Sequence, residues 1–242
     1  MIVLFTDFGL AGPYIGQMKA VLARDAPGVP VIDLFADAPM QNPRAASYLL
    51  AAYAAWFPAR SVILAVVDPG VGSSRAAIAA LADGRWYVGP DNGLFEPVLR
   101  RAADARLWEI TARPALLSAS FHGRDLFAPA AALIARGGAP QWERRPLEMA
   151  RRPLWPDDLG EIVYLDHYGN AMTGLRASVL SPGARLVTDG RAIPRARTFA
   201  DVPAGSAFWY ENSNGLAEIA VNLGRADETL GLRVGSSIAV ED

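Results

Sequence analysis

Residues 61–75 decide the fold class, and they read Ser61-Val62-Ile63-Leu64-Ala65-Val66-Val67-Asp68-Pro69-Gly70-Val71-Gly72-Ser73-Ser74-Arg75. The stretch opens with an almost unbroken apolar run, which is typical of a strand buried on both faces of a parallel sheet. A loop rich in glycine and polar residues follows at once. The stretch therefore predicts a buried strand whose carboxyl end carries a polar loop.

Similar apolar runs recur through the first 150 residues, with helical patterns between them. Tyr14, Met18, Val21 and Leu22 fall at helical spacing, and residues 45–56 and 124–135 are further helix candidates. Strands that alternate with helices indicate a mostly parallel sheet covered by helices, so residues 1–150 are predicted to be an α/β domain. The predicted strands are Ile2–Phe5, Val29–Phe35, Ser61–Val67, Ala76–Leu81 and Trp86–Val88.

The pattern changes after residue 137. Residues 137–140 and 151–160 are rich in glycine and proline and are interpreted as a linker. Short alternating segments separated by turn dipeptides follow, without helical periodicity, which predicts a smaller all-β, barrel-like domain over residues 160–242. Its predicted strands are Glu161–Leu165, Ala184–Val187, Ser206–Tyr210, Leu216–Val221 and Ser236–Val240.

The composition excludes several classes of protein. The net charge of −2 predicts neither a nucleic-acid partner nor a polybasic membrane surface. The chain has no cysteine and only two histidines, His122 and His167, which excludes thiol chemistry and any multi-histidine metal site. No apolar run approaches the ~20 residues that span a bilayer, and no signal peptide is seen at Met1. We therefore expect a cytoplasmic protein without a membrane segment.

Four polar, glycine-containing loops stand where predicted strands end or the last helix begins. In an open parallel sheet, ligands gather at the carboxyl ends of the strands. Each loop alone is explained as well by a helix cap or an ordinary turn, but four on one edge would face a common crevice. No Walker or G-x-G-x-x-G motif accompanies them, so a nucleotide phosphate is not predicted. The loops are residues 6–9, 68–75, 89–93 and 121–125.

Taken in order, these motifs resemble the S-adenosyl-L-methionine hydroxide adenosyltransferase family, whose relatives include the bacterial fluorinase and chlorinase. The resemblance continues through residues 166–170 and 211–220 and so spans nearly the whole chain. The motifs that carry it are Thr6-Asp7-Phe8-Gly9 with Tyr14, Gly16 and Lys19, then Asp68-Pro69-Gly70-Val71-Gly72-Ser73 with Arg75, then Gly89-Pro90-Asp91-Asn92-Gly93, and Phe121-His122-Gly123-Arg124-Asp125.

The resemblance implies an enzyme that hydrolyses S-adenosyl-L-methionine to adenosine and L-methionine by in-line attack of water or hydroxide on ribose C5′. It implies no metal and no cofactor, because the thioether leaves as a neutral group. The positions matching the family's water-holding set are Asp68, Arg75 and His122, in which Arg75 would hold the oxygen, His122 would accept or relay a proton, and Asp68 would orient them. It also implies a homotrimer whose active sites lie at subunit interfaces.

The resemblance further assigns the substrate's parts. Asp7 is expected to bind the ribose hydroxyls, Asp166 the ammonium group and Ser213 the carboxylate. Adenine is expected to stack on Tyr168 and Phe199, although Phe199 is equally well explained as a core residue. The remaining expected substrate-binding residues are Asn170, the backbone near Val221, and Glu218.

Two other functions stay open at this point. A chlorinase would use chloride as the nucleophile, but the carboxylate of Asp68 would repel a halide. A sensor that binds adenosine or S-adenosyl-L-methionine without turnover is not excluded by polar loops. Asn214 stands where the fluorinase has an arginine and Met40 where it has a tryptophan, so the methionine end is expected to be held differently.

Overall fold

The computed structural model describes residues 1–242, which divide into two units, Met1–Arg152 and Pro153–Asp242. The division falls inside the second of the two predicted linker stretches, residues 151–160. The prediction that residues 137–140 belong to the linker is wrong. They form the turn that leads into an edge strand of the first unit's sheet, Trp142–Arg145, which pairs with Ala105–Ile110.

The first unit is built on a seven-stranded sheet in the order β2-β1-β3-β5-β4-β6-β7. The four neighbouring strands β2, β1, β3 and β5 are parallel to one another, whereas β4, β6 and β7 each pair antiparallel with their neighbours. Five of the seven strands consequently run in one direction, as a mostly parallel sheet requires. The strands are β1 (Ile2–Thr6), β2 (Val31–Phe35), β3 (Val62–Val66), β4 (Ala77–Ala82), β5 (Arg85–Pro90), β6 (Ala105–Ile110) and β7 (Trp142–Arg145).

Burial explains which strands the sequence revealed. Every residue of β1 and β3 is buried, and both were predicted from their continuous apolar runs. The strands β6 and β7 were missed, because charged residues such as Arg106 and Glu109 interrupt their patterns and β7 lies at the edge. The β4–β5 connection is the two-residue turn Asp83-Gly84, too short for a crossover, so β4 has to run antiparallel to β5.

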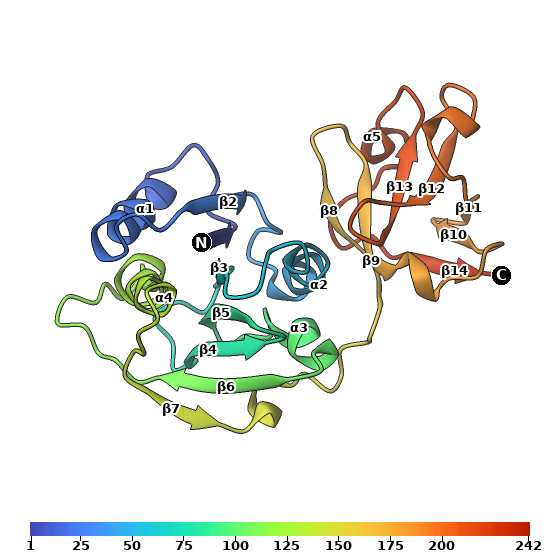
Figure 1. Ribbon diagram of the computed structural model, residues 1–242. Helices are drawn as coiled ribbons and strands as arrows, with labels where there is room; N and C mark the ends of the chain where they lie inside the picture. Colours follow the sequence, from blue (N-terminus) through green and yellow to red (C-terminus); the bar gives the residue numbers. More distant parts are fainter. The chain divides into compact units, whose positions relative to one another are not determined.

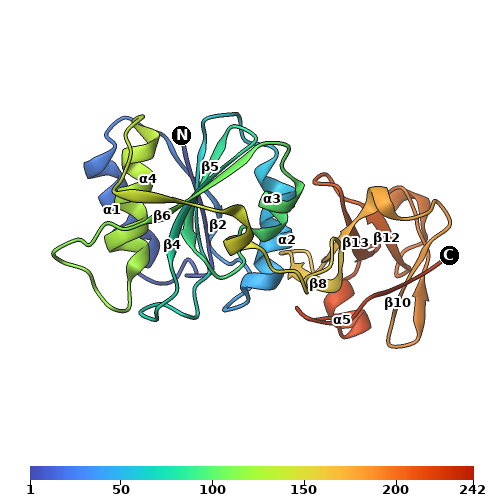
Figure 2. The ribbon, with the colours of Figure 1, turned by 90° about the horizontal axis from the view of Figure 1, so that it is seen from below.

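Helices cover both faces of this sheet (Figures 1 and 2). α1 and α4 pack together on one face, and α2 and α3 pack together on the other. The side chain of Asn42 caps α2 by accepting a hydrogen bond from the backbone N–H of Ala45 at 3.0 Å. A π-helical turn, Gly123–Phe127, precedes α4. The helices are α1 (Tyr14–Asp25), α2 (Pro43–Ala54), α3 (Glu96–Arg101) and α4 (Ala128–Ala135).

The chain order of the strands sets the place of the site. From β1 the chain passes to β2 on one side, and then crosses over to β3 on the other side of β1. The loops after β1 and β3 consequently diverge and leave a crevice between them, which is the usual ligand position in such sheets. Asp7 follows β1 directly, and Asp68 stands two residues beyond the last residue of β3.

The second unit consists of a four-stranded antiparallel sheet, β12-β13-β9-β8, and a three-stranded antiparallel sheet, β11-β10-β14. Buried side chains including Trp209, Ile162 and Leu186 form its core. The strands are β8 (Leu159–Leu165), β9 (Ala171–Arg176), β10 (Arg185–Thr188), β11 (Arg191–Ile193), β12 (Ala207–Glu211), β13 (Leu216–Val221) and β14 (Ala239–Glu241).

One expectation for this unit is not confirmed, and another is wrong. The two sheets are linked at their edges by the isolated bridges Glu161–Ser237 and Arg195–Trp209 and by nearby backbone hydrogen bonds rather than by a continuous ladder, so a closed barrel is not confirmed. The unit is also not all-β, because residues 226–230 form the short helix α5 (Ala226–Leu230), which ends at Gly231 with φ of 66°. A helix of five residues is too short to show the periodicity that reveals a helix in sequence. None of the chain's helices has the length and apolar character needed to cross a membrane.

Candidate functional site

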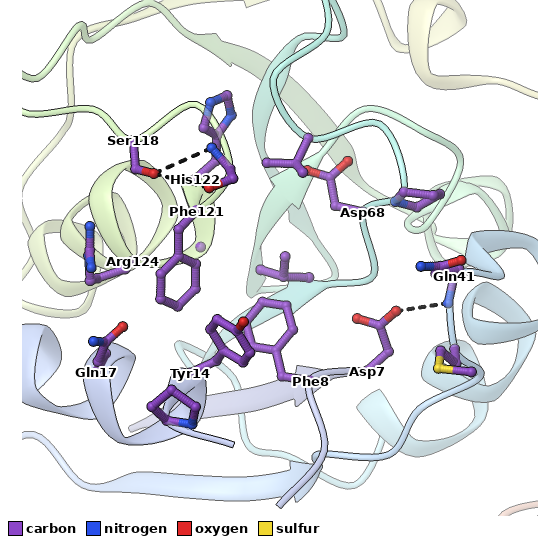
Figure 3. A pocket seen from close by; sticks show the side chains of 17 residues that line it. Asp7, Phe8, Tyr14, Gln17, Gln41, Asp68, Ser118, Phe121, His122 and Arg124 are labelled. Carbon is purple, nitrogen blue, oxygen red and sulfur yellow. Dashed lines mark hydrogen bonds between the residues drawn. The ribbon is translucent and has the colours of Figure 1, made fainter. Parts of the chain in front are cut away.

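A cavity of about 680 Å³ opens at the carboxyl ends of β1 and β3 in the first unit. Three of the four polar loops line it, namely those beginning at Thr6, Asp68 and Phe121 (Figure 3). The fourth, residues 89–93, does not. The walls of the cavity are formed by Asp7, Phe8, Pro13, Tyr14, Gln17, Met40, Gln41, Val66, Asp68, Pro69, Val71, Ser118, Ser120, Phe121, His122, Gly123 and Arg124.

Asp7 forms one side of this cavity. Its Oδ2 atom accepts a hydrogen bond of 2.8 Å from the backbone N–H of Gln41, which follows β2 (Figure 3). Burial raises the pKa of Asp7, and the nearby carboxylate of Asp68 raises it further, against the lowering effect of the Gln41 hydrogen bond. No hydrogen bond from another residue reaches the Oδ1 atom of Asp7, so this oxygen can accept hydrogen bonds from a ligand.

Asp68, Arg75 and His122 form one hydrogen-bonded set. The guanidinium of Arg75 binds the carboxylate of Asp68 through Nε, at 3.0 Å from both oxygens, and also through Nη2. The same Nη2 lies 3.0 Å from Nδ1 of His122. The side chains of Arg75 and Asp68 are 10% and 4% exposed, so water screens their interaction little. The three predicted residues are therefore brought together.

This arrangement decides which nitrogen of His122 carries the proton. A guanidinium has hydrogen-bond donors and no acceptor, so Nδ1 of His122 has to be the acceptor from Arg75. His122 is consequently neutral, with its proton on Nε2. Burial lowers the pKa of His122, and the charge of Arg75 lowers it further, while Asp68 and Asp125 act in the opposite direction. Nε2 is the only ring nitrogen left for a ligand, and it is a donor.

Arg75 does not line the main cavity but stands behind Asp68 and His122. It lines a smaller cavity of about 200 Å³, which His122 also borders. Its guanidinium lies 5.1 Å from the centre of the Phe127 ring. Arg75 therefore meets the main cavity through Asp68 and His122, the two side chains that it contacts and that line the cavity.

Close contacts between loops position this set. Gly72 has φ of 80°, and a Cβ there would lie 2.6 Å from the carbonyl oxygen of Ala119, so only glycine lets these loops approach. The carboxylate of Asp125 accepts a 2.9 Å hydrogen bond from the backbone N–H of Ser118. Asn92, in the loop outside the cavity, donates to the carbonyl of Val67 at 2.8 Å and so supports the peptide before Asp68.

An aromatic wall, which the sequence analysis does not predict, completes the cavity. The rings of Phe8, Tyr14 and Phe121 pack edge to face, with centroids 5.3–5.9 Å apart. Arg124 lies over Phe121 with its guanidinium 5.1 Å from the ring centre. All three aromatic residues stand inside the motifs that carried the resemblance, and that position is the signal that could have revealed them.

In the second unit, Asp166 organises the turn between β8 and β9. Its Oδ1 accepts hydrogen bonds from the backbone N–H groups of Tyr168 and Asn170 at 2.9 and 2.8 Å. Its Oδ2 accepts a third from the side chain of Asn170 at 3.0 Å. Tyr168 is 73% exposed, and Asn170 is buried. This turn thus places Asp166, Tyr168 and Asn170 close together.

The other expected residues of this unit lie on β13 and its surroundings. Phe199 is not a core residue, since it is only half-buried, and it packs edge to face on Phe208 and Tyr210 at 5.1 and 5.4 Å. Ser213 is exposed in the turn before β13. The side chain of Val221 belongs to the core, so only its backbone can meet a ligand. Glu218 is 2% exposed and bound to Tyr210 and Asn212.

No group of three or more histidine, cysteine or acidic side chains in the chain is arranged to hold a metal ion. The cavity of the first unit presents carboxylate oxygens, a neutral imidazole N–H and aromatic rings, and Arg124, the basic residue in its lining, is paired with Asp125. Such a surface suits an uncharged polar or a cationic ligand rather than an anion.

Comparison with known proteins agrees with the motifs. The SAM hydroxide adenosyltransferase N-terminal domain matches residues 2–142, and the C-terminal domain of the same family matches residues 160–239. An (R)-S-adenosyl-L-methionine hydrolase of Thermus thermophilus is 44% identical, with 98% of each chain covered. A more distant fluorinase of an Actinoplanes species is 24% identical, covering 99% of this chain and 97% of that one.

Solved structures agree in fold as well. A crystal structure of an uncharacterized conserved protein from Thermotoga maritima superposes with a TM-score of 0.83 at 33% identity, with both chains covered completely. The two family domains together match nearly the whole chain, and each falls on one of the two structural units. The chain therefore belongs to the SAM hydroxide adenosyltransferase family.

Proposed function

We propose that this protein hydrolyses S-adenosyl-L-methionine to adenosine and L-methionine. The observation that carries the proposal is the hydrogen-bonded set of Asp68, Arg75 and His122 at the wall of the main cavity. Because the similar proteins are named for the (R) epimer at sulfur, we propose that this epimer is the preferred substrate.

The geometry supports a division of labour around one water molecule. Nε2–H of His122 donates to the water oxygen, and the carboxylate of Asp68 accepts one of its hydrogens, so a lone pair is directed at C5′. The C5′–O bond forms as the C5′–S bond breaks, its electron pair stays on sulfur, and the water proton passes to Asp68 or to solvent. Arg75 holds both partners and fixes the histidine tautomer.

The remaining residues bind the substrate in this proposal. Asp7 accepts hydrogen bonds from the ribose hydroxyls, and Asp166 pairs with the ammonium group. Ser213 binds the carboxylate, Phe199 and Tyr168 stack on adenine, and Asn170 with the backbone at Val221 contacts its edge. The aromatic wall of Phe8, Tyr14 and Phe121 keeps bulk water from the reacting carbon.

One experiment separates this function from its alternatives. Purified protein is incubated with each sulfur epimer of S-adenosyl-L-methionine, with and without chloride, and the products are resolved by chromatography. We expect adenosine and methionine in equal amounts, independent of chloride. A 5′-halogenated adenosine would identify a halogenase, and unchanged ligand would identify a binding protein without catalysis.

Replacing Asp7 by alanine is expected to raise KM about 10- to 100-fold with little change in kcat, because hydrogen bonds to a charged group are lost in ground and transition states alike. Steady-state kinetics and calorimetry with adenosine provide the measurement. Asp33→Ala, on β2 and paired with Lys19 outside the cavity, is the matched control and should leave both constants unchanged. An unchanged KM with a reduced kcat would show that Asp7 acts in the chemical step.

The pH dependence of kcat follows from the tautomer of His122. Protonation would place a hydrogen on Nδ1 opposite the donor of Arg75, so the set works only while His122 is neutral. Since the pKa of His122 lies below the ordinary 6.5, kcat should stay constant at neutral pH and fall only in more acidic solution. His122→Gln, which cannot titrate, should lack this acidic limb. A decline of kcat centred above 6.5 would contradict this assignment.

We further propose that the enzyme is a homotrimer in which the first unit of one subunit and the second unit of its neighbour complete each active site. The supporting fact is that the residues assigned to water and ribose all lie in the first unit, whereas those assigned to adenine and methionine all lie in the second. The expected cytoplasmic location stays a prediction.

A further inference from the structure

Glu218 is a buried carboxylate at the centre of the second unit's larger sheet. It lies on β13, between Tyr210 of β12 and Met172 of β9, and is 2% exposed. Its neighbours Ala217 and Ile219 point into the core between the sheets, so Glu218 points to the opposite face. Phe208 and Tyr210 lie on that same face, where Phe199 packs on them.

Both oxygens of Glu218 accept hydrogen bonds from neutral donors. The hydroxyl of Tyr210 lies 2.6 Å from Oε1, and Nδ2 of Asn212 lies 2.7 Å from Oε2. The amide of Asn212 cannot be turned round, because its Oδ1 accepts from the backbone N–H groups of Asn214 and Leu216 at 2.9 and 3.0 Å. No lysine, arginine or histidine forms an ion pair with Glu218. Burial raises the pKa of Glu218, and the hydrogen bonds from Tyr210 and Asn212 offset that burial only in part, without any basic side chain.

Through its two hydrogen-bond donors, Glu218 is linked to two of the groups that the second unit is proposed to offer the substrate. Tyr210 links it to Phe199. Asn212 links it to the turn that carries Ser213. The charge of Asp166 raises the pKa of Glu218, while Arg225 interacts with Asp166 in turn. Glu218 thus keeps its charge on this face with no basic side chain paired to it, and a bound cation would offset that cost.

We propose that Glu218 is a specificity-determining residue that makes the enzyme prefer a sulfonium ligand to the corresponding neutral thioether. This inference rests on the proposed function and names a role that differs from direct contact. Because both oxygens are already bound to the protein, Glu218 acts by its charge and by holding the Ser213 turn.

The charges of the ligands make the preference specific. S-Adenosyl-L-methionine carries a sulfonium, an ammonium and a carboxylate and is a net cation, whereas S-adenosylhomocysteine lacks the sulfonium charge and is neutral. The two differ by one methyl group and one charge, so an effect of Glu218 on their ratio reports charge recognition. The same attraction ends when the C5′–S bond breaks, because both products are neutral overall, and this favours their release.

The test compares the two ligands in Glu218→Gln, which keeps the shape of the side chain and removes its charge. Dissociation constants are measured by calorimetry in an Asp68→Asn background, so that the sulfonium ligand persists. We expect the preference for S-adenosyl-L-methionine over S-adenosylhomocysteine to fall about tenfold, equivalent to about 1.4 kcal/mol. Equal weakening of both ligands would show a merely structural role and overturn the proposal.

Two controls keep the result interpretable. Glu211→Gln removes an acidic group whose side chain is 52% exposed at the end of β12, and should leave the ratio unchanged. Glu218→Asp keeps the charge and should keep the preference even if both affinities fall. If Glu218→Gln does not fold, inhibition of the unmodified enzyme by S-adenosylhomocysteine tests the proposal instead. A Ki equal to the KM of the substrate would overturn it. Absence of any hydrolysis would instead refute the proposed function.

Discussion

Replacing Asp68, Arg75 or His122 singly by alanine is expected to lower kcat by about 10²- to 10⁴-fold, the range for a positioned acid–base group. The three side chains form one hydrogen-bonded set, so removing any member disturbs the other two. Arg75→Ala combined with His122→Ala should therefore cost scarcely more than the worse single change. Single-turnover rates of the four variants with saturating substrate provide the measurement.

Substrate affinity distinguishes this result from general damage to the protein. Neither Arg75 nor His122 is assigned to the adenosine or methionine parts of the substrate, so KM should change little in their variants. Arg75→Lys is an informative companion, because an ammonium cannot reproduce the forked contacts to Asp68 and His122 and should restore little activity. Fully additive losses, or a near-normal kcat in His122→Ala, would show that another group activates the water.

Mixed oligomers are expected to recover activity from two inactive variants. One variant carries Asp68→Ala in the first unit, and the other carries Asp166→Ala with Phe199→Ala in the second. In a cyclic trimer that contains both, one of the three interfaces joins an intact first unit to an intact second unit, so about a third of the wild-type rate should return. Co-expression with two affinity tags and tandem purification isolates these mixed species.

Each variant purified alone is the control and should remain inactive. If every active site lay within one chain, each site of a mixed oligomer would contain a lesion, and no activity would return. If the activity of the mixed oligomers were no higher than that of either variant alone, the shared active site would be refuted. The proposal that the protein hydrolyses its substrate would not be affected. An active monomer in solution would refute it as well.

The sequence predicted much of the first unit because its central strands β1 and β3 are buried on both faces. Continuous apolar runs such as Ser61–Val67 are typical of such strands, and β1, β2, β3, β4 and β5 were all predicted, although β2 lies at the sheet edge and only its Phe35 is buried. The strands β6 and β7 escaped, since a half-exposed or edge strand can carry charges that hide its pattern. Closure of the second unit into a barrel depends on pairing between distant segments, which local patterns do not report.

The sequence by itself determined the family and the residue types of the site, because ordered motifs spread over the whole chain record both. Only the tertiary structure decided how those residues act. Arg75 and His122 are 47 residues apart in the sequence, and only the folded chain brings the guanidinium donor of Arg75 to Nδ1 of His122. This contact leaves Nε2 of His122 to face a ligand. Likewise, only folding buries Glu218 between two neutral donors with no cation beside it.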